Sequence, residues 1–208
     1  MKKTYTINIS GSVFHIEDDA YTELNQYLTR LKQHFGNNEE GQEIYSDIEA
    51  RIAEIFNNRK TAEEEVITLK WVHEVIETMG IPEEIEAEEE NGQSFSRKNK
   101  KRLYRDPDHK VIGGVCGGLA AYFNMDPVIM RLIFVFLFLV NGLGLLIYII
   151  LWIAVPEAKN TAQRLEMRGE AVTVDNIEKW IKKEYQDIES RVKKMNWGKK
   201  KKNSETEK

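Results

Sequence analysis

Side chains that commonly carry catalysis or bind metals are few in this sequence and are spread along its length. The histidines and the one cysteine are His15, His34, His73, His109 and Cys116. Their spacing matches neither the HExxH helix nor the paired Cys/His ligands of zinc sites, and no GxSxG motif occurs. The carboxylates fall in charged runs, which are typical of solvated faces. We therefore expect no enzymatic activity, no catalytic residue, no cofactor and no metal site.

One glycine-rich stretch, VIGGVCGGLAAYF at 111–123, has the composition of a segment that approaches another group closely. Nucleotide binding is disfavoured, because no P-loop lysine follows and no strand–turn–helix context surrounds the glycines. Small residues four positions apart instead favour close helix packing or shallow insertion into a membrane. The glycines concerned are Gly113, Gly114, Gly117 and Gly118. Cys116 is interpreted as a small packing residue, with a redox sensor or a palmitoylation site as alternatives.

These glycines precede an apolar segment, 132–155, that has no charged residue in 24 positions. As a helix it would measure roughly 36 Å, enough to cross a hydrocarbon core of about 30 Å with some tilt. Asp126 and Pro127 fit an N-cap and a first helical position, so we expect a helix to begin there and to run past Arg131 into the segment. The pattern predicts one transmembrane helix.

The middle of the apolar segment holds Asn141, Gly142 and Gly144, and it permits two interpretations. Asn141 can hydrogen-bond to another helix within a straight span, or these residues can form a kink or a re-entrant turn. A straight span places the C-terminal region outside, whereas a turn keeps both ends inside, since neither half is long enough to span alone. Tyr148 and Trp152 lie toward the far end, where Trp152 fits an interfacial aromatic belt.

Charge is segregated along the chain, although the net charge is only −4. Residues 1–96 carry 8 basic and 21 acidic side chains, whereas residues 97–131 carry 8 and 3. The basic cluster comprises Arg97, Lys98, Lys100, Lys101, Arg102 and Arg105. Beside an apolar segment, this cluster is interpreted as facing anionic membrane lipid and as keeping the N-terminal side in the cytoplasm. A DNA-binding function would need residues 1–82 to bind DNA, and their acidity argues strongly against nucleic acid as a partner.

Residues 1–82 predict a small cytoplasmic α+β domain. Alternating apolar residues predict a β-hairpin, and apolar residues at helical spacing predict three helices. The hairpin is expected at 4–16 and the helices at about 18–35, 40–58 and 69–79. No apolar core of a signal peptide is present near the N-terminus, and a single cysteine permits no internal disulfide. The core is thin, so we expect this domain to dock on itself, on a partner or on a second copy.

The remaining segments are expected to connect or extend these units. They are an acidic-to-basic linker at 83–101, a linker at 157–172, an amphipathic helix at 173–197 and a basic disordered tail at 198–208. The helix is predicted by apolar residues at spacings of three and four between Val174 and Met195. The pattern is compatible with a coiled coil, an interfacial helix or one wall of a soluble bundle. Trp180, Trp197 and the lysines favour contact with a membrane or a partner protein.

Several ordered motifs occur together between residues 102 and 156. They are Leu103-Tyr104-Arg105, Gly114-Val115-Cys116-Gly117-Gly118-Leu119-Ala120, Tyr122-Phe123, Asp126-Pro127, Arg131, and Tyr148 through Trp152 to Pro156. In this combination they resemble the phage shock protein C domain family. The resemblance implies an inner-membrane component of a bacterial envelope-stress response. Members sense envelope damage and regulate by binding partner proteins, including a peripheral effector that restrains transcription.

Pattern and resemblance together favour an α+β membrane protein that acts as a regulatory adaptor through protein–protein binding. We expect it in the bacterial inner (cytoplasmic) membrane, with residues 1–82 in the cytoplasm. Membrane strain would change packing around 113–118 and 141–144 and thereby expose or hide a binding face. The alternative is a membrane scaffold that self-associates through small-residue helix contacts, with a second copy of the chain as its partner.

Overall fold

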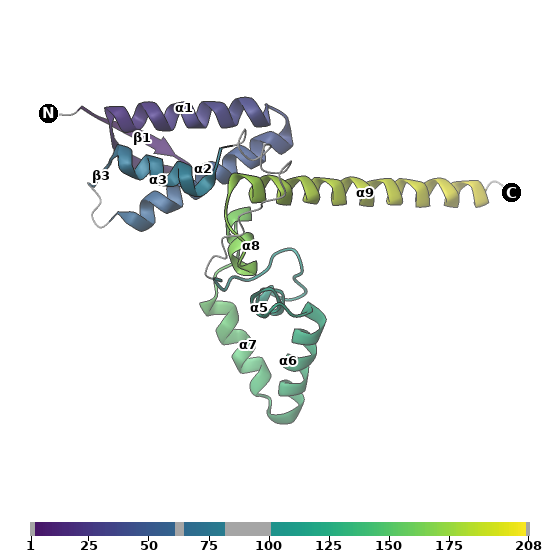
Figure 1. The fold of residues 1–208 in the computed structure, drawn as a ribbon. Helices are drawn as coiled ribbons and strands as arrows, with labels where there is room; N and C mark the ends of the chain where they lie inside the picture. The colour runs from purple at the N-terminus through teal and green to yellow at the C-terminus, as the bar shows by residue number, and fades with distance from the viewer. Residues whose placement is uncertain (1–2, 61–64, 82–100, 207–208) are drawn as a thin grey trace, which may run out of the picture.

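The computed structural model describes residues 3–60, 65–81 and 101–206. The elements are β1 (Thr4–Ile9), β2 (Ser12–Glu17), α1 (Asp18–Phe35), α2 (Glu39–Arg59), β3 (Val66–Ile67), α3 (Leu69–Met79), α5 (Val115–Phe123), α6 (Pro127–Asn141), α7 (Leu143–Ala154), α8 (Thr161–Arg168) and α9 (Val174–Thr206). The elements from β1 to α3 form the head. The α6–α7 hairpin projects away from it, and α9 leaves the head in a different direction as one long helix (Figure 1). The expected α+β class, with an N-terminal β-hairpin and several helices, is confirmed.

The sheet of the head has three strands in the order β1-β2-β3. β1 and β2 are antiparallel and are joined by Ser10 and Gly11, whose φ angles of 48° and 79° produce the tight left-handed turn that hairpins favour. β3 pairs with β2 in parallel, with Ile16 opposite Ile67. The sequence pattern left residues 66–67 open between an extended piece and the start of a helix, and they are extended.

The helices of the head bury one face each. On α1 the buried residues Ala20, Leu24, Tyr27 and Leu31 follow the spacing of an amphipathic helix, and the Tyr27 hydroxyl donates to the Gly80 carbonyl at 2.9 Å. The start of α2 is capped by a side-chain oxygen of Asn38. The bounds of α1, α2 and α3 lie within one residue of those that the apolar periodicity predicted.

The core of the head is completed by helices from the other end of the chain. Leu165 of α8 and Val174, Ile177 and Ile181 of α9 are buried in the same apolar cluster as residues of α1, α2 and the sheet. The thin core expected for residues 1–82 is thus covered by the chain's own C-terminal region.

Two predicted segments differ from the structure. The linker predicted at 157–172 contains α8, whose first turn is capped by Asn160. The disordered tail predicted at 198–208 is helical as far as Thr206, because α9 continues without a break beyond residue 197. The predicted linker at 83–101 lies outside the described residues except for its last position.

The apolar segment differs as well. It consists of two helices, α6 and α7, and not of one straight helix. Among the described residues, no single helix is long and apolar enough to cross a membrane; α5 together with Pro127–Val140 reaches that length and hydropathy, with a bend of 118° between the two.

Candidate membrane-docking site

The α6–α7 hairpin is built by a cap at its start and a glycine at its turn. The Asp126 side chain accepts a hydrogen bond from the Val128 N–H at 2.6 Å, which fixes the first turn of α6. Gly142 ends α6 with φ +70°, a conformation that glycine adopts without strain, and its N–H donates to the Phe138 carbonyl at 2.9 Å. Of the two interpretations of Asn141–Gly144, the structure has the turn. The Asn141 side chain lies outside the described part of the chain.

Gly144 brings the two helices of the hairpin into direct backbone contact. A Cβ at this position would lie 2.6 Å from the Phe138 nitrogen and 2.7 Å from the Phe134 carbonyl oxygen, both on α6. One turn farther along α7, the Tyr148 ring packs edge-on against Phe134, with 5.5 Å between the ring centroids. Glycine is therefore required at position 144 for the hairpin to close.

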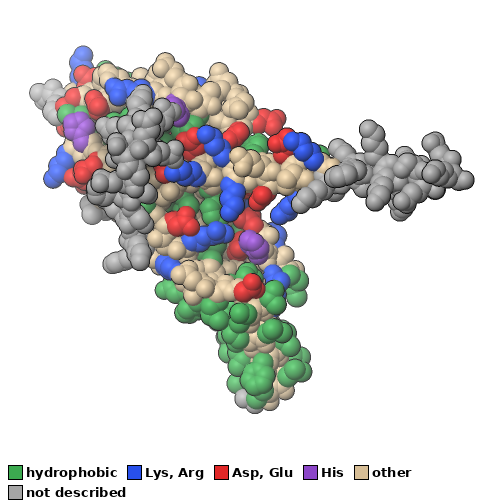
Figure 2. Space-filling view, turned by 45° about the vertical axis from the view of Figure 1, so that its right-hand side comes forward, with side chains coloured by type: hydrophobic (Ala, Val, Ile, Leu, Met, Phe, Trp, Pro, Cys, Tyr) green, Lys and Arg blue, Asp and Glu red, His purple; other side chains and the backbone are tan. Residues whose placement is uncertain are grey.

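The exposed surface of the α6–α7 hairpin is formed mainly by apolar side chains of both helices. Large side chains are exposed on both helices; Leu139 and Ile153, for example, are 75% and 81% exposed. Figure 2 shows hydrophobic side chains over most of the visible face of this part of the molecule, while charged side chains are scattered over the visible face of the head. Monomeric soluble proteins rarely expose a contiguous apolar patch of this extent. The hairpin is thus the surface of the described chain best suited to hydrocarbon.

The glycine-rich stretch before the hairpin packs α5 onto an extended segment, residues 104–106. A Cβ on Gly118 would lie 1.9 Å from the Tyr104 carbonyl oxygen, and one on Gly117 would lie 2.9 Å from the Asp106 Cβ. Gly114 has φ +76° and sits against the Asp106 backbone. These glycines therefore serve a contact between a helix and an extended strand, rather than one between two helices.

α5 fills the open end of the hairpin. Cys116 and Ala120 on α5 form a small buried cluster with Met130 on α6, and Phe134 and Tyr148 pack against it. Cys116 is 9% exposed, as expected for a packing residue. Within the ranges that the structure describes, no three His, Cys, Asp or Glu side chains gather closely enough to hold a metal ion.

Arg105 joins the glycine-rich stretch before α5 to the end of α7. Its Nε donates to the Val155 carbonyl at the end of α7, and its Nη1 donates to the Gly113 carbonyl, both at 2.9 Å. Its backbone bridges to Glu157, and its Nη2 lies 3.6 Å from a carboxylate oxygen of Glu157. Because the guanidinium is held by groups of its own chain, the prediction that Arg105 faces lipid is corrected to an internal clamp.

Arg131 ties α6 to the loop that leads into α5. Its Nη2 donates to the His109 carbonyl at 2.9 Å. The His109 ring nitrogen Nδ1 lies 2.9 Å from a carboxylate oxygen of Asp106, whose other oxygen accepts from the Asp108 N–H at 2.8 Å. Asp106 is 5% exposed and organises this loop. The sequence pattern gave Asp106 no role.

The two other described members of the basic cluster also have internal partners. The Lys101 ammonium donates to the Tyr122 carbonyl and to the Asn124 side chain, each at 2.9 Å. Arg102 lies 3.4 Å from Glu54 and 3.7 Å from Glu166. These contacts secure the chain between the head and α5, a role that the interpretation as lipid-facing charges did not include. Arg97, Lys98 and Lys100 lie outside the described residues.

A buried charged junction at Glu166 connects α8 to α2 of the head and to the extended segment 104–106. One carboxylate oxygen accepts from Arg51 of α2 at 2.8 Å, and the other accepts from the Tyr104 hydroxyl at 3.2 Å. Arg51 also pairs with Glu54 at 2.8 Å. Burial raises the pKa of the Tyr104 phenol, which keeps the hydroxyl protonated as a donor at neutral pH. Arg51 and Glu166 were not predicted as functional residues. Arg51 lies in a predicted helix and Glu166 in a predicted linker, and neither belongs to a recognisable motif.

The shared core and this junction constrain the path of the chain. The head precedes the α6–α7 hairpin in the sequence, and α8 and α9 follow it. The head, α8 and α9 nevertheless pack in one apolar cluster. The Thr161 N–H at the start of α8 also donates to the Asp47 carboxylate of α2 at 2.8 Å. The two flanks of the hairpin therefore lie on the same side of it.

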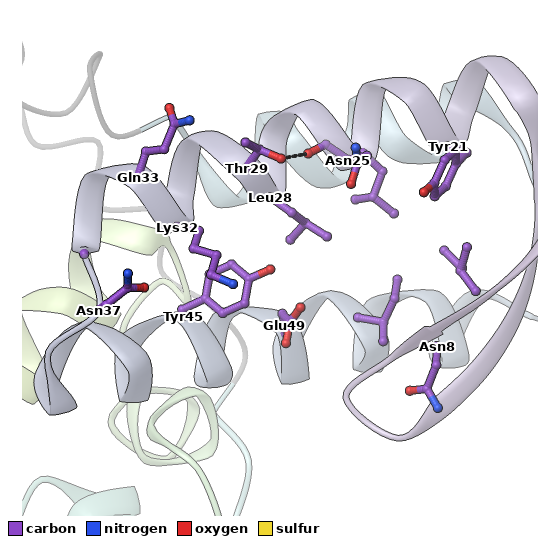
Figure 3. Close-up of a pocket in the computed structure, with 14 residues that line it drawn as sticks. Asn8, Tyr21, Asn25, Leu28, Thr29, Lys32, Gln33, Asn37, Tyr45 and Glu49 are labelled. Carbon is purple, nitrogen blue, oxygen red and sulfur yellow. Dashed lines mark hydrogen bonds between the residues drawn. The ribbon is translucent and has the colours of Figure 1, made fainter.

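A groove of about 760 Å³ opens on the head between α1 and α2 (Figure 3). Ile7 of the edge strand β1 and Leu28 contribute apolar surface, while Lys32 and Glu49 contribute charge at the lining. Tyr45 projects into the groove, and burial together with a hydrogen bond to Glu49 raises the pKa of its phenol. Polar and apolar side chains share the lining about equally, so the groove differs from the predominantly apolar pockets that bind small molecules.

Comparison with known proteins identifies the central unit. The model of the PspC domain matches residues 101–158, which include α5, α6 and α7. Among curated proteins, the chain is 44% identical over 61 residues to YvlC of Bacillus subtilis (strain 168), described as an uncharacterized membrane protein; the match covers 28% of this chain and 94% of YvlC. No solved structure matches the chain.

Proposed function

Because the chain belongs to the PspC domain family, we propose that it is a membrane-anchored regulatory adaptor of a bacterial envelope-stress response. In this proposal the α6–α7 hairpin inserts into the inner (cytoplasmic) membrane from the cytoplasmic side. The head and α9 stay in the cytoplasm and bind a protein partner. The membrane assignment is supported by the exposed apolar surface of the hairpin and by the membrane protein among its relatives.

The observation that carries the proposal is the single core formed by the head, α8 and α9. Both flanks of the hairpin are tied together, so a hairpin that enters a membrane must return to the side from which it came. The lengths agree, since 15 residues of α6 and 12 of α7 measure about 22 and 18 Å, less than a hydrocarbon core of about 30 Å. The proposal is therefore a re-entrant anchor.

Two surfaces of the cytoplasmic part are suited to a protein partner. One is the groove between α1 and α2, which combines apolar and charged side chains. The other is the part of α9 beyond its docked first turns, where Ile188 and Val192 are exposed on the stripe whose earlier member Ile181 is buried in the core. The groove lies on the head and the stripe on α9, and both elements pack in the apolar cluster beside the junction at Glu166. In this proposal a change at the hairpin reaches the two surfaces through these packed groups.

The scaffold alternative requires small residues that are free to contact a second copy. Gly117 and Gly118 are occupied by residues 104–106, and Gly144 is occupied by α6. The observed contacts therefore favour the adaptor.

A photo-crosslinking experiment in bacterial cells tests the proposal. A photoreactive amino acid replaces Lys32 at the groove or Ile188 on α9 of the full chain, and Val13, which is exposed on β2, serves as the control position. We expect a crosslink to a different protein at Lys32 or Ile188 that changes when the envelope is stressed, and none at Val13. Products that contain only this chain would favour the scaffold, and the absence of any product at both positions, with and without stress, would contradict the adaptor.

A further inference from the structure

We infer that the membrane-contact surface extends beyond the α6–α7 hairpin to an apolar collar, made of Val111, Ile112, Phe123 and Met125, that seats at the lipid headgroup boundary. The inference rests on the proposed insertion of the hairpin and adds the depth at which insertion stops. None of the four residues belongs to the charge-free segment 132–155. The occupant of this surface is the interface of a lipid bilayer.

The four collar residues present apolar side chains to the surroundings. Val111 and Ile112 are 72% and 67% exposed, and Phe123 and Met125 are 58% and 41% exposed. A single exposed apolar residue is ordinary in a soluble protein, but these four adjoin a hairpin that is itself apolar on its outer surface. Continuity with the hairpin surface is the first argument for lipid as the occupant.

One half of the collar is fixed beside the end of α7. The Ile112 carbonyl accepts a hydrogen bond from the Tyr148 hydroxyl. The following residue, Gly113, lies against Trp152, since a Cβ there would be 2.8 Å from the indole Nε1. Arg105 bonds to the carbonyls of both Gly113 and Val155. These contacts hold residues 111–112 level with the last turn of α7.

The other half of the collar is fixed beside the start of α6. Phe123 is the last residue of α5, and the Met125 N–H donates to the Ala120 carbonyl at 2.8 Å. The next residue, Asp126, is the cap of α6. Because α6 begins and α7 ends at the open end of the hairpin, where α5 lies across it (Figure 1), the two halves flank the same level of the hairpin.

The neighbours of the collar are those expected at a headgroup boundary. Trp152 is 46% exposed, and tryptophan favours the interface between hydrocarbon and water. Lys110 directly precedes the collar and is more than half exposed, with its ammonium 3.5 Å from Glu157. This ion pair places charged groups directly beside the apolar collar, as a boundary between hydrocarbon and water requires. With the collar at the boundary, the turn at Gly142 reaches about 22 Å, the length of α6, into a hydrocarbon core of about 30 Å. It passes the bilayer midplane and stops short of the headgroups of the far leaflet.

Depth-dependent fluorescence quenching tests the collar in the full chain. The native cysteine is replaced (Cys116→Ala), and single cysteines at Ile112, Phe123, Leu143 or Val13 carry an environment-sensitive fluorophore. The protein is bound to vesicles of phosphatidylethanolamine and phosphatidylglycerol that contain a quencher at the headgroup or deep in the acyl chains. We expect headgroup quenching at positions 112 and 123, acyl-chain quenching at position 143, and quenching only by aqueous iodide at position 13 on the head.

The outcomes separate the collar from the anchor. If position 143 is quenched from the acyl chains while positions 112 and 123 respond to iodide as position 13 does, the collar is refuted and the anchor stands. If positions 112 and 123 are shielded from iodide and from both lipid quenchers, a protein covers them and the collar is again refuted. If position 143 responds to iodide alone, both proposals fail.

A partition measurement provides a second test without labels. The double variant Val111→Ser with Phe123→Ser removes two large apolar side chains from the proposed interface, and it is expected to bind vesicles about tenfold more weakly. Val13→Ser removes an apolar side chain of similar exposure from the head, and it is expected to leave binding unchanged. Equal binding by both variants would refute the collar.

Discussion

The junction at Glu166 offers the sharpest prediction of stability. The Glu166 side chain is 7% exposed, and it accepts from Arg51 at 2.8 Å and from the Tyr104 hydroxyl at 3.2 Å. Glu166→Ala leaves the Arg51 guanidinium, which is 12% exposed, with Glu54 as its remaining carboxylate partner among the described residues. Breaking a buried ion pair costs about 3–5 kcal/mol, and the retained Glu54 contact places the expected loss near the lower end, at about 3 kcal/mol.

The assay is urea unfolding of the full chain in detergent micelles, followed by tryptophan fluorescence. Trp71 and Trp180 pack against the core of the head and report its unfolding. The matched control is Glu189→Ala on α9, where an exposed glutamate pairs with Lys193 at 2.6 Å. Exposed pairs are screened by water and contribute little, so the control is expected to keep the unfolding midpoint of the unmodified chain. Equal midpoints for the Glu166 and Glu189 variants would refute the junction as a structural link.

Three further predictions concern the central unit. Gly118→Ala places a Cβ 1.9 Å from the Tyr104 carbonyl oxygen, so thermal unfolding should show a loss of about 3 kcal/mol; an unchanged melting temperature would contradict the close contact. Arg105→Lys keeps the charge but loses the hydrogen bond from Nε to the Val155 carbonyl. We expect the free energy of unfolding to fall by about 2 kcal/mol in the same assay. No loss would indicate a lipid-facing charge, for which lysine would suffice. Gly144→Val should force α6 and α7 apart, and spin labels on the two helices would report the separation; an unaltered distance would refute the packing at Gly144.

Local structure was largely predictable because it depends on local chemistry. Apolar residues at spacings of three and four located α1, α2, α3 and the start of α9, and Asp126 with Pro127 located the start of α6. The turn at Gly142 was one of two open interpretations, because glycine is compatible with a continuous membrane helix and with a break. Only contacts between the two halves of the segment, such as Gly144 against Phe134, distinguish them.

Long-range contacts explain what the sequence analysis missed. α8 has only eight residues, and two of its five buried residues, Thr161 and Glu166, are polar, so its pattern is too short and too polar to stand out from a linker. Arg105 was interpreted from its charged neighbours, whereas its partner Val155 lies 50 positions later. The docking of α9 on the head depends on which apolar helix faces pack together. The spacing of Ile177 and Ile181 predicts an apolar face on α9, but it does not show which element that face contacts. Packing of this kind follows from the whole fold.

The measurement that bears most directly on the central claim is the topology of the two flanks. Reporters that are active on only one side of the membrane are fused to the N-terminus and after Lys208 of the full chain. Because the head, α8 and α9 share one core, we predict that both reporters are active in the cytoplasm and that neither is active outside. A reporter after Lys208 that is active outside while the N-terminal reporter is active in the cytoplasm would contradict the re-entrant anchor and restore a single span.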